Sequence, residues 1–442
     1  MKDKLDFFIS FFLKAKEKCF YDFSFVCLSI LICIIPLPNV INNIVVGIFV
    51  FYTILQIRRV KFVFTIEMLL PIVFFLWMAI SCFWSTDFIG SLHALPKESS
   101  LLLLPFCCAI IFIHNKELLI KYYSISMSFY IVFFLTKAVF RFLTEENITV
   151  FFGHELVTKD LNAIHFSAFV SVAFFYFLTK EIKTKIDYLQ LLLLALFLAL
   201  LNSKSIIFVD ILLVGLYFFF YSKSANKMRL RNIVLLGIVF FSFLFFNRIK
   251  EKIEFEFQLN KDNNIGHTVI PKEIVGDRII SMKEAWENDK FEQTDFFSGA
   301  SFRVYQFRMF LEIMKEENVF FQGLGLNASY KKLEEKGLKY NIFHGNETTE
   351  GYQKKNFHNQ YVQVFAELGF IGFVILALIL FVNLKNALKN KDFIHIAFAI
   401  LMISLFLTES FLWRQRGVVF FTLFYCLFNL KNTRQNCIKQ TS

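Results

Sequence analysis

The residues best suited to chemistry lie at the mouth of a long apolar run, where residues 356–373 read NFHNQYVQVFAELGFIGF. His358 and Asn359 stand just before the run, where lipid would give way to water. A neutral imidazole in such a place can accept a proton from a hydroxyl group, which is the work of a general base. The alternative is structural, with His358 and Asn359 together capping the helix at the membrane interface.

Three polar residues continue into the apolar run. Gln360, Gln363 and Glu367 follow each other at helical spacing, which predicts one polar stripe on the helix that faces the interior of a bundle. His358 lies nine residues before Glu367, about half a turn out of phase, so the two side chains are not expected to touch. His358 should instead face the membrane surface.

Two arginines precede this run in the amphipathic segment 302–317, FRVYQFRMFLEIMKEE. Arg303 and Arg308 carry the forked, permanent charge that suits phosphate groups. An enzyme that breaks a bond to a lipid diphosphate without a metal needs such cations on the leaving group. The other interpretation is that Arg303 is a solvated charge on a surface helix. No DxD-like acidic cluster is evident in this region, and no metal site is expected.

The elements that position these residues are apolar helices. The chain has 442 residues, 56% of them hydrophobic, and 63 are Phe. Repeated apolar runs exclude a soluble domain and predict an all-α polytopic membrane protein. Twelve transmembrane spans are expected, at 23–36, 39–57, 62–83, 99–114, 118–140, 161–179, 186–201, 205–222, 231–249, 358–383, 393–411 and 415–430.

Lys and Arg concentrate in alternate short loops, which predicts that both termini are cytoplasmic. Residues 1–249 then hold spans one to nine, residues 250–357 form one large outer loop, and residues 358–442 hold the last three spans and a cytoplasmic tail. The net charge of +11 is spread over the short loops, so no nucleic-acid partner is expected. Within the loop we predict short amphipathic helices, a tight turn at 320–327 and a flexible stretch at 331–356.

Ionisable residues within the spans lie mostly near the outer leaflet. They are Lys137, Arg141, His165, Lys204, Asp210, Glu409, Arg414 and Arg416, whereas Glu67 lies near the inner end of its span. Such residues are costly in lipid and commonly functional, although each could be a structural pair or a snorkelling side chain. An ion pathway would thread polar groups through the full depth, so the bias favours a site served from the outer surface.

The order of these motifs resembles the O-antigen ligase and O-antigen polymerase superfamily, bacterial envelope glycosyltransferases with a large periplasmic loop. The resemblance is carried by Arg303 at the start of an amphipathic helix, the turn Gly323-Leu324-Gly325, FHNQYVQVFAELGFIG and LTESFLWRQRGVVFF. It covers about residues 300 to 425, and the twelve-span layout extends it over the chain.

The resemblance implies a GT-C-like fold, a periplasmic site in the bacterial inner membrane, and metal-independent transfer with no cofactor. The implied donor is a glycan on undecaprenyl diphosphate, and the implied acceptor is a sugar hydroxyl of lipid A-core or another glycan. By the same resemblance His358 corresponds to the base and Arg303 to a catalytic cation, and Asn359 would orient His358 or the acceptor. The other candidate substrate-binding residues are Lys204, Arg308 and His165. Lys204 lies in the turn Ser203-Lys204-Ser205, where the family has Arg in place of Lys.

The sequence leaves three functions open. A ligase transfers the glycan to lipid A-core, whereas a polymerase of O-antigen or another surface polysaccharide transfers it to a second lipid-linked glycan. A transporter of lipid-linked glycans is the alternative from another class. It would favour internal repeats and broken helices at mid-membrane, and neither is clear in this sequence.

Overall fold

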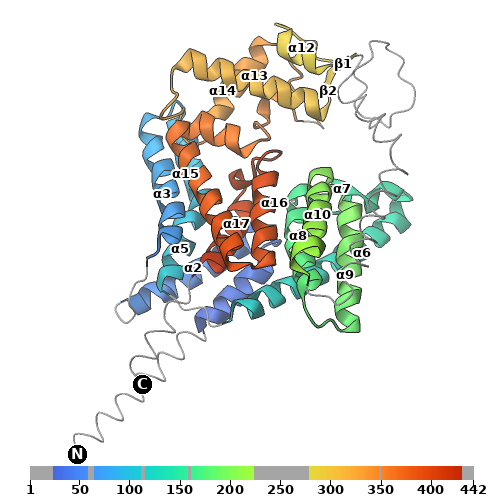
Figure 1. Cartoon of the computed structure of the whole chain (residues 1–442). Coiled ribbons are helices and arrows are strands. Elements are labelled where there is room, and N and C mark those ends of the chain that lie inside the picture. The colour runs from blue at the N-terminus through green and yellow to red at the C-terminus, as the bar shows by residue number, and fades with distance from the viewer. Residues whose placement is uncertain are drawn as a thin grey trace, which may run out of the picture.

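The chain folds as a bundle of apolar helices that carries a smaller helical region at one end (Figure 1). The structure, a computed structural model, describes residues 23–57, 64–110, 115–157, 161–222, 278–347 and 350–430. The predicted span at 231–249 and the first part of the predicted loop, 250–277, lie outside these residues. The helices of the bundle are Phe23–Ile34, α2 (Asn39–Gln56), α3 (Ile66–Ser81), η2 (Cys82–Trp84), α4 (Phe88–Glu98), α5 (Ser100–Ile110), α6 (Lys116–Glu145), η3 (Ile148–Phe151), α7 (Gly153–Leu156), α8 (Ala163–Thr179), α9 (Lys185–Leu201), α10 (Lys204–Leu216), η4 (Tyr217–Tyr221), α15 (Gln360–Asn390), α16 (Phe393–Leu405), η6 (Phe411–Trp413) and α17 (Gln415–Asn429).

Side-chain caps fix where several helices begin. Asn162 accepts hydrogen bonds from the backbone N–H groups of Ile164 and His165 at the start of α8. Thr184 and Asp187 form a reciprocal capping box at the start of α9. These caps satisfy backbone donors that a helix end would otherwise leave unpaired.

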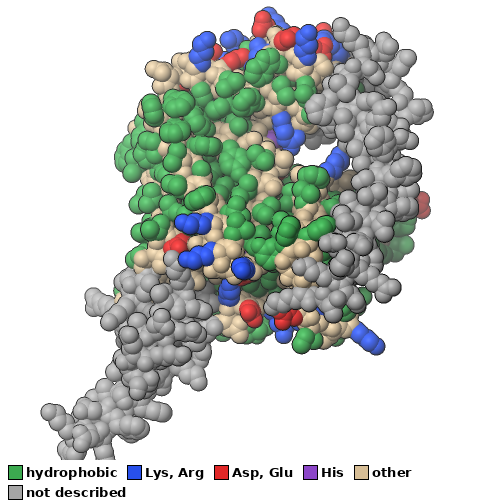
Figure 2. All heavy atoms as spheres, in the orientation of Figure 1, with side chains coloured by type: hydrophobic (Ala, Val, Ile, Leu, Met, Phe, Trp, Pro, Cys, Tyr) green, Lys and Arg blue, Asp and Glu red, His purple; other side chains and the backbone are tan. Residues whose placement is uncertain are grey.

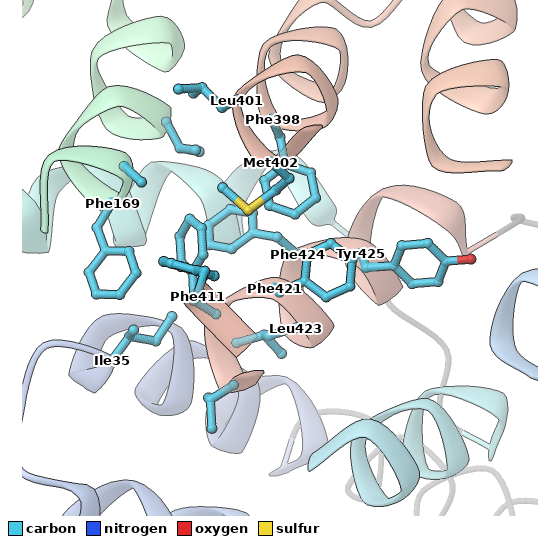
Figure 3. Packing of buried hydrophobic residues seen from close by; sticks show 14 of the residues in the cluster. Ile35, Phe169, Phe398, Leu401, Met402, Phe411, Phe421, Leu423, Phe424 and Tyr425 are labelled. Atoms are coloured by element: carbon cyan, nitrogen blue, oxygen red, sulfur yellow. The ribbon is translucent and has the colours of Figure 1, made fainter. Parts of the chain in front are cut away.

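The centre of the bundle is packed with aromatic rings (Figure 3). Phe398 of α16 lies 5.6 Å from Phe424 of α17, and Phe169 of α8 lies 4.5 Å from Phe420, measured between ring centroids. Burying rings of this size supplies much of the packing energy of such a core. The richness of the sequence in Phe is therefore used to join α8, α16 and α17.

The outer surface of the bundle is also apolar, as expected for a helical membrane protein. Large side chains such as Phe51, Phe129 and Phe220 are 66%, 72% and 75% exposed. Figure 2 shows hydrophobic side chains over the middle of the visible face, with charged groups gathered towards its two ends. Among the described residues, four helices are long and apolar enough to cross a membrane by length and composition: Ile66–Trp84, Lys116–Glu145, Lys204–Tyr221 and Gln360–Asn390. The number of twelve spans remains a prediction.

The helical region at one end comes from the predicted loop (Figure 1). It comprises β1 (Arg278–Ile280), α12 (Met282–Glu287), β2 (Asp295–Phe297), α13 (Gly299–Glu317), α14 (Ser329–Lys339) and η5 (Tyr352–Lys354). Its core is built from rings such as Phe291, Phe297 and Tyr305. The expected amphipathic helix at 302–317 is present as α13. The expectation of a flexible stretch from residue 331 was wrong for α14, which packs against α13 and η5. The short parallel pairing of β1 with β2 was not expected.

A backbone junction fixes this region to the bundle. Residues 320–325 lie beside a kink in α15 at Gly369, and Leu324 N–H donates to the Ala366 carbonyl at 2.9 Å. Phe370 N–H donates in return to the Phe320 carbonyl at 2.8 Å. Gly323 and Gly369 both have left-handed φ, of 74° and 67°. A Cβ on Gly369 would lie 2.2 Å from the Phe321 carbonyl oxygen, so only glycine allows this approach. We call the end of the bundle beneath α12–α14 the loop end, and the opposite end, where α15 and α17 finish, the far end.

Candidate functional site

His358 lies at the loop end, directly before the cap of α15. Asn359 is the N-cap, and its Oδ1 accepts hydrogen bonds from the N–H groups of Tyr361 and Val362 at 3.0 and 3.1 Å. Its Nδ2 donates to the Leu407 carbonyl at 3.1 Å, which ties the start of α15 to the end of α16. Asn359 thus has a structural task and holds the adjacent His358 in place.

The backbone of His358 adopts an uncommon conformation. Its φ is 48°, in the left-handed region, and its N–H donates to Asn356 Oδ1 at 2.9 Å. A residue other than glycine pays on the order of 1 kcal/mol for this conformation, and such residues gather at functional sites. The conformation breaks the helical path ahead of Asn359.

Glu409 is the partner of the His358 side chain. The Nδ1 of His358 lies 3.7 Å from Oε2 of Glu409, and the two side chains are 31% and 10% exposed. Glu409 lies beyond the end of α16, in the turn that leads to η6. At this distance the two side chains form no direct hydrogen bond, but they are close enough for their charges to interact. A charged carboxylate facing Nδ1 favours a proton on that nitrogen and leaves Nε2 as an acceptor.

Arg303 approaches the same place from α13. Its guanidinium donates to the Gly299 carbonyl at 2.9 Å and to the carbonyl of Thr408, the residue before Glu409, at 3.3 Å. Arg303 and Asn359 line a cleft of about 390 Å³, part of it open to solvent. Its other lining residues are Phe307, Phe357 and Val362. We refer to His358, Asn359, Glu409 and Arg303 together as the His358 site.

His165 lies on the other side of Glu409, in the first turn of α8. It is buried, and its ring centroid is 4.5 Å from that of Phe411. His165 also lines a second and larger cleft of about 750 Å³, again partly open. We call this the basic cleft, and it is lined by Asn39, Lys97, Leu161, Asn162, His165, Phe169, Trp413, Arg414, Gln415 and Arg416.

Arg308 is directed away from the His358 site. Its guanidinium pairs with Glu312 at 2.9 Å and with Asp289 at 3.3 Å, and it lies 4.9 Å from the ring centroid of Tyr340. Arg308 lies five positions after Arg303, so on a helix the two side chains point about 140° apart. Its guanidinium is thus engaged within the core of α12–α14.

Lys204 is the first residue of α10 and is exposed. It lies outside the lining of both clefts. The structure therefore brings together His358, Arg303 and Asn359, places His165 beside them, and sets Arg308 and Lys204 apart from the two clefts.

Sequence reasoning assigned His165 to the site, but it did not assign Glu409 or the other residues of the basic cleft. A signal was present, because the stretch TESFLWRQR, residues 408–416, places polar residues between two apolar helices. Its meaning depended on which earlier residues it would meet. Among the described residues, no group of three or more His, Cys, Asp or Glu side chains is arranged to hold a metal ion.

Part of the chain is similar to a known protein family. Residues 189–377 match the family described as O-antigen ligase, and the match includes Arg303, His358 and Asn359. This stretch of the chain is an O-antigen ligase domain. No curated protein matches the chain. The domain occurs in O-antigen ligases and polymerases, so it indicates an enzyme that transfers glycans from lipid-linked substrates.

Proposed function

We propose that this protein is a ligase that transfers a glycan from undecaprenyl diphosphate to a sugar hydroxyl of lipid A-core, at the periplasmic face of the bacterial inner membrane. The observation that carries the proposal is the approach of His358 to the buried carboxyl of Glu409, next to Thr408, whose carbonyl Arg303 contacts. This arrangement offers a base and a cation at one place on the loop end. The family match to an O-antigen ligase supports the glycan as the group transferred.

The reaction joins the acceptor oxygen to C1 of the donor sugar. Nε2 of His358 takes the proton of the acceptor hydroxyl while its oxygen attacks C1. The bond between C1 and the diphosphate oxygen breaks, and the diphosphate leaves with the electron pair. Glu409 faces Nδ1 and stabilises the imidazolium that forms. Direct displacement inverts the configuration at C1.

Arg303 is the cation closest to this chemistry. Its guanidinium lies at the cleft and stabilises negative charge as it develops on the leaving diphosphate. Lys204 remains a candidate second cation because it is exposed at the start of α10. We assign Arg308 to the stability of the α12–α14 region, because Glu312 and Asp289 already pair with it.

Envelope glycans from a deletion strain test the proposal. The strain is complemented with wild type, His358→Ala or His395→Ala, and its glycans are separated on a gel. If the protein is a ligase with His358 as its base, polymer is lost from lipid A-core and persists on the lipid carrier. This result is expected both in the deletion strain and in the strain complemented with His358→Ala. His395 is the matched control, since it is a buried His at the far end.

Other gel patterns identify other functions. Single repeat units on the core would replace the ligase assignment with a polymerase. Absence of any periplasmic lipid-linked glycan would indicate a transporter. Full glycan transfer by His358→Ala would show that His358 is not the general base.

A further inference from the structure

The basic cleft gathers positive charge from distant parts of the chain. Lys97 comes from the last turn of α4, while Arg414 and Arg416 flank the start of α17. His165 and Asn162 come from the start of α8, and no Asp or Glu is among the lining residues. Like charges brought this close repel one another unless an anion joins them.

Two of these cations, Lys97 and Arg414, form no ion pair with an acid of the described residues. Glu98, the residue after Lys97, is only 3% exposed and does not line the cleft. Arg416 is held by the backbone, where its Nε donates to the Leu37 carbonyl at 3.0 Å.

The start of α17 adds to the positive field. Arg414 is the N-cap of this 15-residue helix, and its side chain forms no capping hydrogen bond. The first N–H groups of a helix carry partial positive charge and bind phosphate readily. Arg414, Gln415 and Arg416 all line the cleft, so this helix end faces it.

The cleft offers more room than a simple ion needs. Its space of about 750 Å³ is partly open to solvent, and its lining is both polar and apolar. Leu161, Phe169 and Trp413 share the lining with the cations. A ligand that complements this mixture has a phosphate-bearing head and an apolar or sugar portion.

The basic cleft adjoins the His358 site through Glu409. His165 lines the cleft and its ring packs on Phe411, two residues after Glu409, while Arg303 donates to the carbonyl of Thr408, the residue before it. Two cationic clefts therefore border one acid–base pair. A transfer reaction between two large lipids needs two binding places that meet at the reacting atoms.

We propose that the basic cleft binds the phosphate-bearing headgroup of a membrane-anchored lipid, with Lys97 and Arg414 as its principal ligands. The inference deepens the proposed function and rests on it, since the phosphate belongs to either the diphosphate of the glycan carrier or the acceptor lipid.

Binding to the full-length protein in phosphatidylcholine nanodiscs tests this proposal. The probes are farnesyl diphosphate for the carrier, bisphosphorylated lipid A for the acceptor, and farnesol as the neutral analogue. Lys97→Gln/Arg414→Gln should weaken binding of one phosphorylated probe by about tenfold or more, because the variant removes two charged hydrogen-bond donors to phosphate. The probe that loses affinity identifies the source of the phosphate.

Lys283→Gln/Lys290→Gln is the matched control, because it removes the same charge from exposed positions outside the cleft. The single variant Lys97→Gln is expected to fold normally, since Lys97 is exposed. It should weaken binding of the same probe by a smaller factor. Equal affinity of wild type and the double variant for both phosphorylated probes would overturn the proposal. So would farnesol binding as tightly as farnesyl diphosphate.

Glycan transfer separates the two proposals. If His358→Ala abolishes transfer but the double variant binds and transfers normally, the inference about the cleft fails and the proposed function stands. If the cleft binds a phosphorylated probe but the protein transfers no glycan, the proposed function fails and the binding site stands.

Discussion

Both ends of the bundle place a histidine among polar side chains, but the two groups differ in what surrounds them. At the far end, His395 Nε2 lies 2.8 Å from Asn383 Oδ1, which also accepts a hydrogen bond from Asn429 at 2.8 Å. Asn386 extends the group by donating to Asn429 Oδ1 at 2.8 Å. We call these four residues the far-end network. At the loop end, His358 has one carboxylate partner at 3.7 Å and lies beside a cleft.

Burial separates the two histidines further. His395 is fully buried, and its ring stacks on Phe428 with centroids 4.7 Å apart and planes at 6°. The side chain of His358 is 31% exposed. A His enclosed by amides and a ring can join helices, whereas a His with one free nitrogen at a cleft can exchange a proton with a ligand. The comparison shows that surroundings, rather than residue type, distinguish the functional His from the structural one.

The largest effect is expected from removing each histidine in turn. His358→Ala should lower glycan transfer by about 100- to 10,000-fold, the usual contribution of a general base. His395→Ala should leave transfer per folded molecule unchanged and lower the melting temperature, because it opens a cavity in the far-end network. Transfer by reconstituted protein and thermal unfolding in detergent measure the two effects. Equal loss of transfer in both variants would break the comparison.

The next effect concerns the junction that holds the loop end together. Gly369→Ala should destabilise the protein by about 2–4 kcal/mol, because the new Cβ would meet the Phe321 carbonyl in a left-handed backbone. Gly47→Ala on α2 is the control, since no atom lies within 4 Å of its Cβ position. Thermal unfolding compares the two variants. A Gly369→Ala protein as stable as Gly47→Ala would show that the junction tolerates a side chain.

A smaller loss should follow when Glu409 loses its charge. Glu409→Gln should lower transfer by roughly 10- to 100-fold, about 1.4–2.8 kcal/mol, because Nε2 of His358 remains but its imidazolium is less stabilised. Glu409→Asp should recover part of the activity. The diagnostic measurement is the pH profile of kcat/KM. Its acid limb should shift to lower pH in Glu409→Gln, because the imidazolium loses the charge that stabilises it, and should shift less in Glu409→Asp. Unchanged transfer by Glu409→Gln would make the pair structural, like the far-end network.

The two arginines of α13 give a sharper contrast within the loop end. Arg303→Ala should lower transfer by about tenfold with little change in stability, since Arg303 is exposed at its cleft. Arg308→Ala should leave transfer per folded molecule intact and increase hydrogen exchange in α13 and α14. The reverse pattern would place the functional cation at Arg308.

The smallest expected effect is a loss of stability of the α12–α14 region at acid pH. Burial would raise the pKa of Glu312, but hydrogen bonds from Lys336 and Tyr340, the charge of Lys336 and a hydrogen bond from Arg308 lower it from 4.5. Its stabilising contribution is complete above pH 4.5 and is lost as pH falls through the lower folded value.

Hydrogen exchange in residues 278–347, corrected for intrinsic rates, should therefore increase below about pH 4.5. The same acid response in Glu312→Gln would assign it to another group.

Local patterns in the sequence predicted much of this architecture. Each predicted span that falls within the described residues has a matching helix, and α13 forms where its spacing predicted. The polar stripe was also correct, because Gln360, Gln363 and Glu367 are all fully buried. Helical periodicity determines these features within a few turns of chain, so no knowledge of distant residues was needed.

Distant contacts were not predictable in the same way. Glu367 accepts hydrogen bonds from Asn327 N–H and Ser329 Oγ, so the buried stripe holds the loop as well as the helix. Arg308 looked as suitable for phosphate as Arg303, and only its contacts with Glu312 and Tyr340 show otherwise.

The sequence by itself determined the helices, the apolar surface and the position of His358 at a helix start, since all three follow from neighbouring residues. The tertiary structure decided that Glu409 faces His358 and that Lys97 and Arg414 share a cleft. These pairs come from helices far apart in the chain, and their meeting depends on how the bundle packs. The periodicity of one helix does not specify the side chains that another helix will present to it.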